Sequence, residues 1–401
     1  MRRLRRHIST VVLVVLLPVL FVAGIWLGGH SDYLPGPVRD AFVADSDGRL
    51  YEEAMDLIER DYYRKVDRDR LLDTSLDSAV DSLHDRFSTY FSPKAYAQFQ
   101  ESTSGQFEGV GMSVEQVERG LRILTVFDRS PAQRAGLRAG DLITAVDGRA
   151  IRGMSSNEAT SLIKGEAGTR VKLTVVSRGR RREVVLRRER VEVPVVQSSI
   201  ERERGKKIAH VRLASFTSGA HGEVRAAVRK ALDKGAEGIV LDLRDNGGGL
   251  LNEAVLVSSI FVPEGTIVST RGRSRPEHTY EATGGAISSK IPVVVLVNRE
   301  SASASEIVTG ALQDHDRAEV VGTRTFGKGV FQEVERLSNG GALDITVGEY
   351  FTPDGRNLGG GGVKEGKGIA PDIAAADNPR TKPDEALEKA LATVAGGPQG
   401  A

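Results

Sequence analysis

The chain of 401 residues contains no cysteine. This absence excludes disulfide bonds, thiolate catalysis and metal sites built on thiolates. Charge of one sign is not in excess either, because the net charge is only +1, so no global field favours nucleic acid as a partner. Aromatic residues make up only 5% of the chain, whereas glycine is abundant. This composition suits an α/β protein with close backbone approaches, long enough for two or three domains.

The N-terminus carries four arginines, directly followed by a run from Ile8 to Gly29 that holds no charged residue. At about 1.5 Å per residue, a helix over this run reaches across a hydrocarbon core of roughly 30 Å. Arginines favour the cytoplasmic side, so the sequence predicts a single-pass anchor of the cytoplasmic membrane over residues 1–30, with the rest of the chain outside. A cleaved signal peptide is the alternative, although Ala23 lies in no Ala-x-Ala pattern.

After a polar linker over 31–49, the remaining chain shows three successive patterns of apolar residues. Apolar residues recur at helical spacing and predict a helical segment over 50–104. Short β-like runs over 105–190 predict a compact β-rich module, with one obvious helix at "SSNEATSLIKG". Over 191–380, apolar strands alternate with amphipathic helices, which predicts a sheet covered on both faces and a β-hairpin-like end at "GALDITVGEYFTPDG". A last helix and a tail are expected over 381–401.

The glycine triplet in "LDLRDNGGGLLNEA" follows a predicted buried strand and precedes a helix. In an open α/β sheet, ligands meet the carboxyl ends of strands, where helix N-termini present free N–H groups. A plain turn needs one glycine, whereas three glycines with Arg244 and Asn246 favour an anion-binding loop that can receive developing negative charge.

The serines of "NRESASASEIVTG" form the second such junction, where Ser301, Ser303 and Ser305 alternate with alanines at the start of a helix. One serine can simply cap this helix, since serine is a common N-cap. The small neighbours nevertheless leave a hydroxyl open to attack a carbonyl, with the following amide free to stabilise an oxyanion.

Lys328 lies in "VGTRTFGKGVFQ", whose spacing resembles a phosphate-binding loop. Such a loop needs serine or threonine after the lysine and then a helix, but here Gly329 follows and Val330-Phe331 is β-leaning. A free lysine has a pKa of about 10.4, and burial among apolar groups favours its neutral amine. Lys328 is therefore predicted as a proton acceptor. A Ser-His-Asp triad stays open as an alternative, because none of the seven histidines lies in a recognisable motif.

These residues resemble the active-site region of the carboxy-terminal processing peptidases, which are serine endopeptidases with a Ser-Lys dyad. The resemblance runs from about Leu50 to Asp372 and includes "SLHDRFSTYFSP", "FEGVGMSV", "LDLRDNGGGLL" and "GKGIAPDI". It implies Ser303 as the nucleophile, Lys328 as the base and Gln332 as the residue that orients the lysine amine.

The resemblance also implies an oxyanion hole and several supporting residues. The N–H of Ala304, together with that of Gly248 or Gly249, would bind the oxyanion. The weaker candidates for supporting roles at the site are Arg244, Glu306, Asp314 and Thr325.

The β-rich module resembles a PDZ domain, a module that binds the C-terminal tails of proteins. Its carboxylate-binding loop would be "GVGM", formed by Gly109, Val110, Gly111 and Met112, with the peptide added as a strand. Arg134 is a candidate relay between this module and the catalytic site, with a surface salt bridge as the alternative role.

The resemblance implies an α/β fold with a ClpP/crotonase-like protease core and an inserted PDZ domain; the N-terminal helical segment and the membrane anchor are expected from the residue patterns given above. The expected function is ATP-independent cleavage of proteins near unstructured C-terminal tails, outside the cytoplasmic membrane. Neither a cofactor, a metal nor a nucleic acid is expected, and a homodimer is a further expectation. The alternatives are an inactive PDZ scaffold on a protease fold and a crotonase-like acyl-CoA enzyme.

Overall fold

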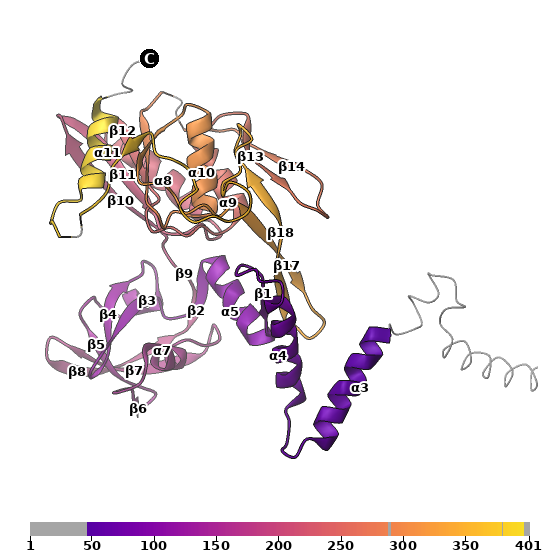
Figure 1. Cartoon of the computed structure of the whole chain (residues 1–401). Coiled ribbons are helices and arrows are strands. Elements are labelled where there is room, and N and C mark those ends of the chain that lie inside the picture. Colours follow the sequence, from indigo (N-terminus) through magenta and orange to yellow (C-terminus); the bar gives the residue numbers. More distant parts are fainter. Residues whose placement is uncertain (1–45, 288–289, 379, 397–401) are drawn as a thin grey trace, which may run out of the picture. The chain divides into compact units, whose positions relative to one another are not determined.

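The computed structural model describes residues 46–287, 290–378 and 380–396. The chain divides into two compact units between Ala79 and Val80, and the helices and strands are labelled in Figure 1. The predicted membrane anchor lies outside the described residues. Within the described ranges, no helix combines the length and the apolar composition needed to cross a membrane.

The predicted helical segment contains three helices and one strand. The helices are α3 (Ser46–Asp61), α4 (Arg68–Asp81) and α5 (Pro93–Ser104). The strand is β1 (Thr89–Phe91), so the prediction of a purely helical segment is wrong there. Its threonine and aromatic residues favour strand, and β1 finds a partner in a strand far along the chain, with Tyr90 opposite Leu343.

The β-rich module is a sheet with the strand order β3-β4-β5-β7-β8, and β6 is paired to β5. Its strands are β3 (Met112–Val117), β4 (Gly120–Val126), β5 (Leu142–Val146), β6 (Arg149–Ala150), β7 (Arg170–Ser177) and β8 (Arg180–Arg187). The predicted helix is α7 (Ser156–Ile163), which begins at a capping box of Ser155 and Glu158, and a short α6 (Pro131–Arg134) accompanies it. The pair β2 (Gln106–Gly109) and β9 (Glu189–Glu192) encloses the module in sequence.

The sheet of the C-terminal region has the order β10-β11-β12-β15-β16-β19 and is parallel except for β10. Its strands are β10 (Val196–Glu203), β11 (Lys206–Leu213), β12 (Gly238–Asp242), β15 (Val293–Val297), β16 (Glu319–Gly322) and β19 (Ile373–Ala374). Every residue of β12 and β15 is buried. This matches their uninterrupted apolar sequences.

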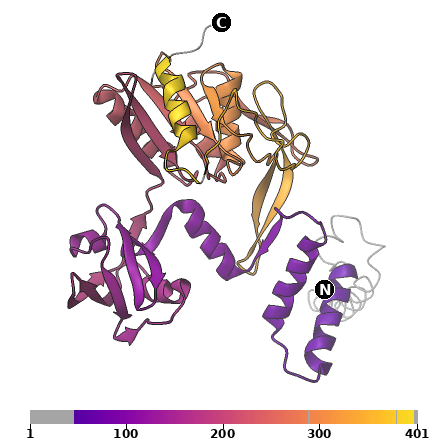
Figure 2. The ribbon, with the colours of Figure 1, turned by 60° about the vertical axis from the view of Figure 1, so that its left-hand side comes forward.

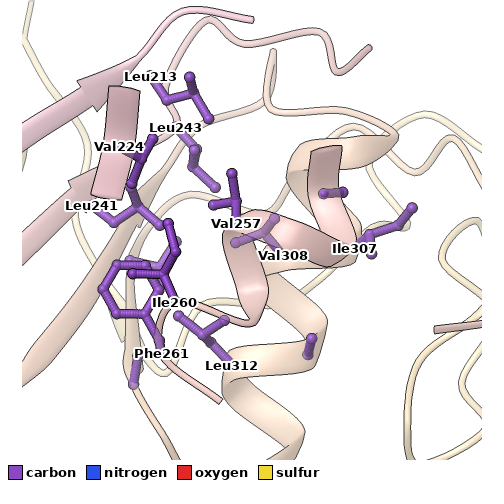
Figure 3. Packing of buried hydrophobic residues seen from close by; sticks show 14 of the residues in the cluster. Leu213, Val224, Leu241, Leu243, Val257, Ile260, Phe261, Ile307, Val308 and Leu312 are labelled. Carbon is purple, nitrogen blue, oxygen red and sulfur yellow. The ribbon is translucent and has the colours of Figure 1, made fainter. Parts of the chain in front are cut away.

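Helices cover both faces of this sheet, as predicted (Figure 2). One apolar core includes α8 (Ala220–Asp233), α9 (Leu251–Ser258) and α10 (Ala304–Asp314). Figure 3 shows its packing, with Val257 of α9 and Leu312 of α10 among the interlocked side chains. A second core packs α11 (Glu385–Gly396) against the opposite face through residues such as Val240 and Leu296.

A second sheet carries the loop that contains Lys328. It contains β1, β13 (Thr266–Arg271), β14 (His278–Glu281), β17 (Val330–Arg336) and β18 (Ala342–Phe351). The predicted hairpin within "GALDITVGEYFTPDG" is wrong, because this sequence forms the single long strand β18. Its hairpin partner is β17, which starts just after Lys328, and the register sets Gln332 opposite Thr346.

Candidate active site

Ser301, Ser303 and Ser305 lie at the entrance to α10, between the carboxyl end of β15 and the helix. Ser301 and Ser305 are fully buried, and their hydroxyls donate to the carbonyl oxygens of Leu243 and Asn246, each at 2.8 Å. Ser303 is 7% exposed relative to a fully accessible serine. The alternation seen in the sequence therefore separates two serines that tie the loop to the end of β12 from one, Ser303, that is also buried but keeps a small exposed fraction.

The backbone of Ser303 is strained, with φ of 54° and ψ of −113°. These angles belong to the first central residue of a type II′ turn, a position that glycine normally takes. Holding a residue with a side chain in such a conformation costs of order 1–3 kcal/mol, and such strain gathers at functional sites. A sharp strand-to-helix turn of this kind presents a nucleophilic serine in other hydrolases.

Glu306 joins the loop that carries Ser303 to the loop that carries Lys328. Its Oε2 accepts hydrogen bonds from the backbone N–H groups of Ser303 and Lys328, both at 2.9 Å. Its Oε1 accepts from the Gly327 N–H at 2.7 Å and from the Thr325 hydroxyl at 2.6 Å. The side chain is fully buried, and burial raises its pKa in spite of these donors. Two of the predicted supporting residues, Glu306 and Thr325, are thus brought together with the serine and the lysine.

Lys328 lies two residues before the start of β17, and its side chain is largely buried. Its Nζ donates to Gln332 Oε1 at 2.8 Å and lies 4.5 Å from the centre of the Phe87 ring. Burial lowers the pKa of Lys328, and the carboxylates nearby, Asp344 foremost, oppose this shift only in part. Among the described residues, no hydrogen bond connects Lys328 Nζ with Ser303 Oγ. The predicted contact between Lys328 and Gln332 is present, whereas the serine and the amine are not yet joined.

The glycine loop lies directly against the serine. A Cβ at Gly248 would stand 2.9 Å from Ser303 Cβ and 3.0 Å from Ala304 N, so only glycine fits there. The Gly248 N–H donates to Asn246 Oδ1 at 2.9 Å and is therefore engaged. The amides of Ala304 and Gly249 donate to no described residue, which makes them the two free N–H groups of the predicted oxyanion hole in this conformation.

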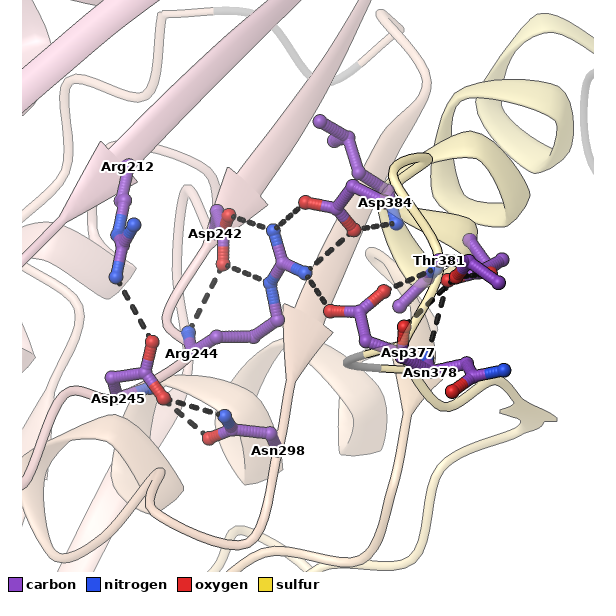
Figure 4. Close-up of polar contacts among 12 residues, drawn as sticks. Arg212, Asp242, Arg244, Asp245, Asn298, Asp377, Asn378, Thr381 and Asp384 are labelled. Atoms are coloured by element: carbon purple, nitrogen blue, oxygen red, sulfur yellow. Dashed lines mark hydrogen bonds and ion pairs between the residues drawn. The ribbon is translucent and has the colours of Figure 1, made fainter.

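Arg244 does not take part in the anion-binding loop to which the sequence assigned it. Figure 4 shows its guanidinium donating to three carboxylates, those of Asp242, Asp377 and Asp384, at 2.8–3.0 Å. Asp384 in turn accepts from the Leu387 N–H at 2.8 Å in the first turn of α11. The physical reason for the correction is the charge of these carboxylates, which draws the side chain away from the glycines and toward the C-terminal helix.

Replacing Arg244 by methionine is expected to lower the free energy of unfolding by about 3–5 kcal/mol, because it leaves a buried carboxylate without its cation. That carboxylate is Asp242, which is fully buried. Burial alone would raise its pKa, but His210 and Arg244 hold the pKa at about 2. Urea unfolding measures the change, and Arg212→Met, whose ion pair with Asp245 is exposed, is the control with an expected loss below about 1 kcal/mol. Equal losses in both variants would contradict this role.

Asp314 and Arg134 also lie apart from the serine. Asp314, at the end of α10, pairs with Arg356 and accepts from the Asp354 N–H at 3.0 Å, so it fixes a turn. Arg134 donates to Glu189 at 2.6 Å in an exposed salt bridge. This contact corresponds to the surface role that the sequence left open as the alternative to a relay.

Three of the five histidines in the described ranges form hydrogen bonds with other residues. His210 bonds Asp242 at 3.0 Å, His221 bonds Glu253 at 2.8 Å, and His315 bonds the Thr266 carbonyl oxygen at 2.7 Å. No described histidine shares a hydrogen bond with Ser303. The geometry thus gives no support to the alternative of a Ser-His-Asp triad.

Sequence reasoning missed the polar residues behind Gln332. Gln332 Nε2 donates to the Thr346 hydroxyl at 2.9 Å, and the Thr346 N–H donates to Ser88 Oγ at 3.0 Å. Ser88 belongs to "SLHDRFSTYFSP", a stretch that was noted for its resemblance but interpreted only as packing. Its composition alone does not reveal that it reaches the site, so the resemblance is the one signal that the sequence offers there.

A groove of about 230 Å³ runs along β3 of the β-rich module. The predicted peptide-binding residues Gly109, Val110, Gly111 and Met112 line it, and α7 forms the opposite wall with Thr160 and Ile163. Because β3 is the edge of its sheet, an extended peptide can pair with it in this groove.

Comparison with known proteins identifies the family. The model of peptidase family S41 matches residues 207–375, and that of the PDZ domain matches residues 122–177. A probable CtpA-like serine protease of Staphylococcus haemolyticus (strain JCSC1435) is 33% identical over 366 residues, which are 90% of this chain and 71% of the relative. The chain belongs to peptidase family S41. The resemblance to the C-terminal processing peptidases is thereby confirmed.

Other relatives set the extent of the match. A probable CtpA-like serine protease of Staphylococcus aureus (strain COL) is 35% identical over 324 residues, or 80% of this chain. The S41 chain described here spans 63% of the length of that relative. A putative S41 protease from Bacteroides fragilis NCTC 9343 is 20% identical, with a TM-score of 0.51 over 84% of this chain and 91% of its own. This likeness shows the mixed α/β S41 fold.

Proposed function

We propose that this S41 family member is an ATP-independent serine endopeptidase that cleaves proteins near their C-termini, with Ser303 as nucleophile and Lys328 as general base. One observation carries the proposal: a single buried carboxylate, Glu306, binds the strained backbone of Ser303 and the backbone of Lys328 at the same distance. This arrangement fixes a hydroxyl and a lysine of lowered pKa on neighbouring loops. It is the constellation that nucleophilic catalysis requires.

The reaction proceeds in two halves. The neutral Lys328 amine takes the proton of Ser303 Oγ while this oxygen attacks the scissile carbonyl carbon, and the free amides of Ala304 and Gly249 bind the oxyanion. The lysine then protonates the leaving amine, and the peptide bond breaks to give an acyl-enzyme. Water attacks this ester, again with Lys328 accepting the proton; the C–Oγ bond then breaks, Lys328 returns the proton to Ser303 Oγ, and the second product leaves with a new carboxylate.

The side chain of Lys328 has to turn from its present position for this step. Its amine is hydrogen-bonded to Gln332, whereas proton transfer needs it within about 2.6–3.2 Å of Ser303 Oγ. The backbone of the lysine is already held by Glu306, so rotation about side-chain bonds is the movement required. Gln332 keeps the waiting amine in the pocket.

The PDZ domain is proposed to select the substrate. An unstructured tail would add a strand to β3, while the loop Gly109–Met112 binds the terminal carboxylate through backbone amides. From the arginine cluster and the uncharged run that follows it, we also propose a membrane-anchored enzyme working outside the cytoplasmic membrane. A ClpP/crotonase-like relationship of the core and a homodimer belong to the same proposal; the parallel sheet between helices supports the former.

A serine-directed fluorophosphonate tests the chemistry. We expect one label per chain, located at Ser303 by mass spectrometry, and labelling that becomes faster as the pH rises through the lowered pKa of Lys328. A protein substrate with a flexible tail, compared with the same substrate amidated at its C-terminus, tests recognition. Loss of the terminal charge is expected to raise KM about tenfold, the effect of one charge-assisted interaction.

Other outcomes of this experiment identify the alternatives. A protein that binds the tail but takes up no label and cleaves nothing would be an inactive PDZ scaffold. Saturable binding of an acyl-CoA ester, without labelling at Ser303, would instead favour the crotonase-like enzyme. Labelling at Ser301 or Ser305 would contradict the assignment of the nucleophile.

A further inference from the structure

The segment Asp85–Ser88 lies against the Lys328 side chain although more than 200 residues separate them in the sequence. It belongs to the same compact unit as the lysine and leads into β1, which pairs with β18. Ser88 is buried, and its Oγ accepts from the N–H of Thr346 in β18. The segment is therefore fixed to the strand that lies beside Gln332.

A chain of hydrogen bonds runs from this segment to the lysine. The Asp85 carboxylate accepts from Ser88 Oγ at 2.7 Å, and the nearby Thr346 hydroxyl contributes to lowering its pKa. Although burial opposes the shift, these donors lower the pKa of Asp85, so it is an anion and only accepts. Thr346 must then donate to Asp85 and accept from Gln332 Nε2, which turns Gln332 Oε1 toward Lys328. The direction of every bond in the chain follows from the carboxylate at its end.

The Phe87 ring is the second contact of the segment. Lys328 Nζ lies 4.5 Å from the ring centre, within the range of a cation–π interaction. The Phe87 N–H donates to Asp85 Oδ1 at 3.1 Å, so the ring and the carboxylate hold one another in place. The amine thus rests between an amide oxygen on one side and an aromatic face on the other.

We propose that Asp85 and Phe87 are positioning residues of the peptidase reaction: Asp85 orients the Gln332 amide through Thr346, and Phe87 holds the Lys328 amine against that amide. The inference rests on the proposed function of Lys328 as the base. It assigns the segment before β1 a direct effect on the base, beyond packing.

Charged groups face the lysine amine from each element packed on it. Asp344 of β18, Asp85 and Glu306 of α10 raise the pKa of Lys328, whereas burial, which has the largest effect, and Arg86 lower it. Removing the charge of Asp85 should therefore lower this pKa, and removing the charge of Arg86 should raise it. A merely structural role of the segment predicts no such opposition of sign.

The test uses Asp85→Asn, Arg86→Gln and Phe87→Leu, with Asp354→Asn as the control for loss of an exposed carboxylate. The first readout is the titration of Lys328, followed by NMR of its ¹³C-labelled ε-carbon in a Ser303→Ala background and assigned with Lys328→Arg. The second is the pH dependence of kcat and KM for the tailed substrate, with Ser303 intact. Arg86 is exposed, so its variant is expected to fold even if a change at the partly buried Asp85 does not allow folding.

We expect the titration midpoint to move to lower pH in Asp85→Asn and Phe87→Leu, to higher pH in Arg86→Gln, and to stay unchanged in Asp354→Asn. At the pH of maximal activity, kcat should fall about tenfold in Asp85→Asn and Phe87→Leu with little change in KM, the factor that corresponds to one charge-assisted hydrogen bond. Phe87→Tyr keeps the ring, so its kcat should match that of the wild type rather than that of Phe87→Leu.

Two results would overturn the inference: midpoints that do not move in Asp85→Asn and Arg86→Gln, or midpoints that move in the same direction in both. The titration needs no catalysis, so it separates this inference from the proposed function. If the wild-type chain neither labels nor cleaves, the proposed function fails, and opposite shifts would still establish the contacts. If the enzyme is active and the midpoints do not move, only the positioning role fails.

Discussion

Replacing Ser303 by alanine is expected to lower kcat/KM for a tailed substrate by at least about 10⁴-fold, because loss of the nucleophile leaves only binding and oxyanion stabilisation. The fold should survive, since the substitution removes only the contact of the Ser303 side chain with the first turn of α10, while Glu306 still binds the backbone of residue 303. Ser303→Gly should be equally inactive but more stable than the alanine variant by about 1 kcal/mol, because glycine adopts the strained angles without cost. Cleavage assays and urea unfolding measure the two effects.

Ser305→Ala is the matched control for this experiment. It removes a neighbouring hydroxyl that donates to the Asn246 carbonyl oxygen, so stability should fall by about 1 kcal/mol while most activity remains. Turnover by Ser303→Ala within tenfold of the wild type would remove the basis of the proposed mechanism. If Ser305→Ala lost activity and Ser303→Ala did not, Ser305 rather than Ser303 would be the nucleophile.

Lys328→Met is expected to reduce kcat by about 10³-fold, within the range of general acid–base catalysis. Lys328→Arg should be as inactive, because arginine keeps the charge but cannot lose its proton. In the wild type, the reactive form is the neutral amine, so kcat/KM should rise with pH through the pKa of Lys328. Burial lowers that pKa, and the rise should therefore occur at lower pH than for an exposed lysine.

The control is Lys364→Met, which removes an exposed lysine whose amine donates to the Gly360 carbonyl oxygen. Its pH profile should match that of the wild type. An active Lys328→Arg variant would show that the charge, not proton transfer, is what the site uses at this position.

Much of the core could be predicted from the sequence because its signals are local. The apolar runs of β12 and β15 and the amphipathic pattern of α11 identify buried strands and a covering helix. The strand β1 could not be predicted in this way, because three residues carry little periodicity and their partner, β18, lies some 250 residues away. The pairing of β17 with β18 is local, and there the expectation placed the turn wrongly, within β18 rather than before it.

The same distinction between local and long-range signals applies to the residues of the candidate site. Ser303, Lys328 and Gln332 could be named because their motifs are contiguous. Arg244 was misplaced because the neighbouring Asp242 and two carboxylates from a distant part of the chain, Asp377 and Asp384, determine its direction. Asp85 and Phe87 were overlooked for the converse reason: nothing in their own stretch of sequence reveals that β1 brings them to the lysine.

The shared carboxylate of Glu306 also bears on how fast the dyad can assemble. Since it holds the peptide backbone of both loops, the proposed assembly of the dyad proceeds by rotation of the lysine side chain. Such a rotation moves one side chain, whereas the opening and closing of a lid moves a whole segment and takes microseconds or longer. Turnover should then be timed by the arrival and departure of the polypeptide rather than by preparation of the catalytic groups.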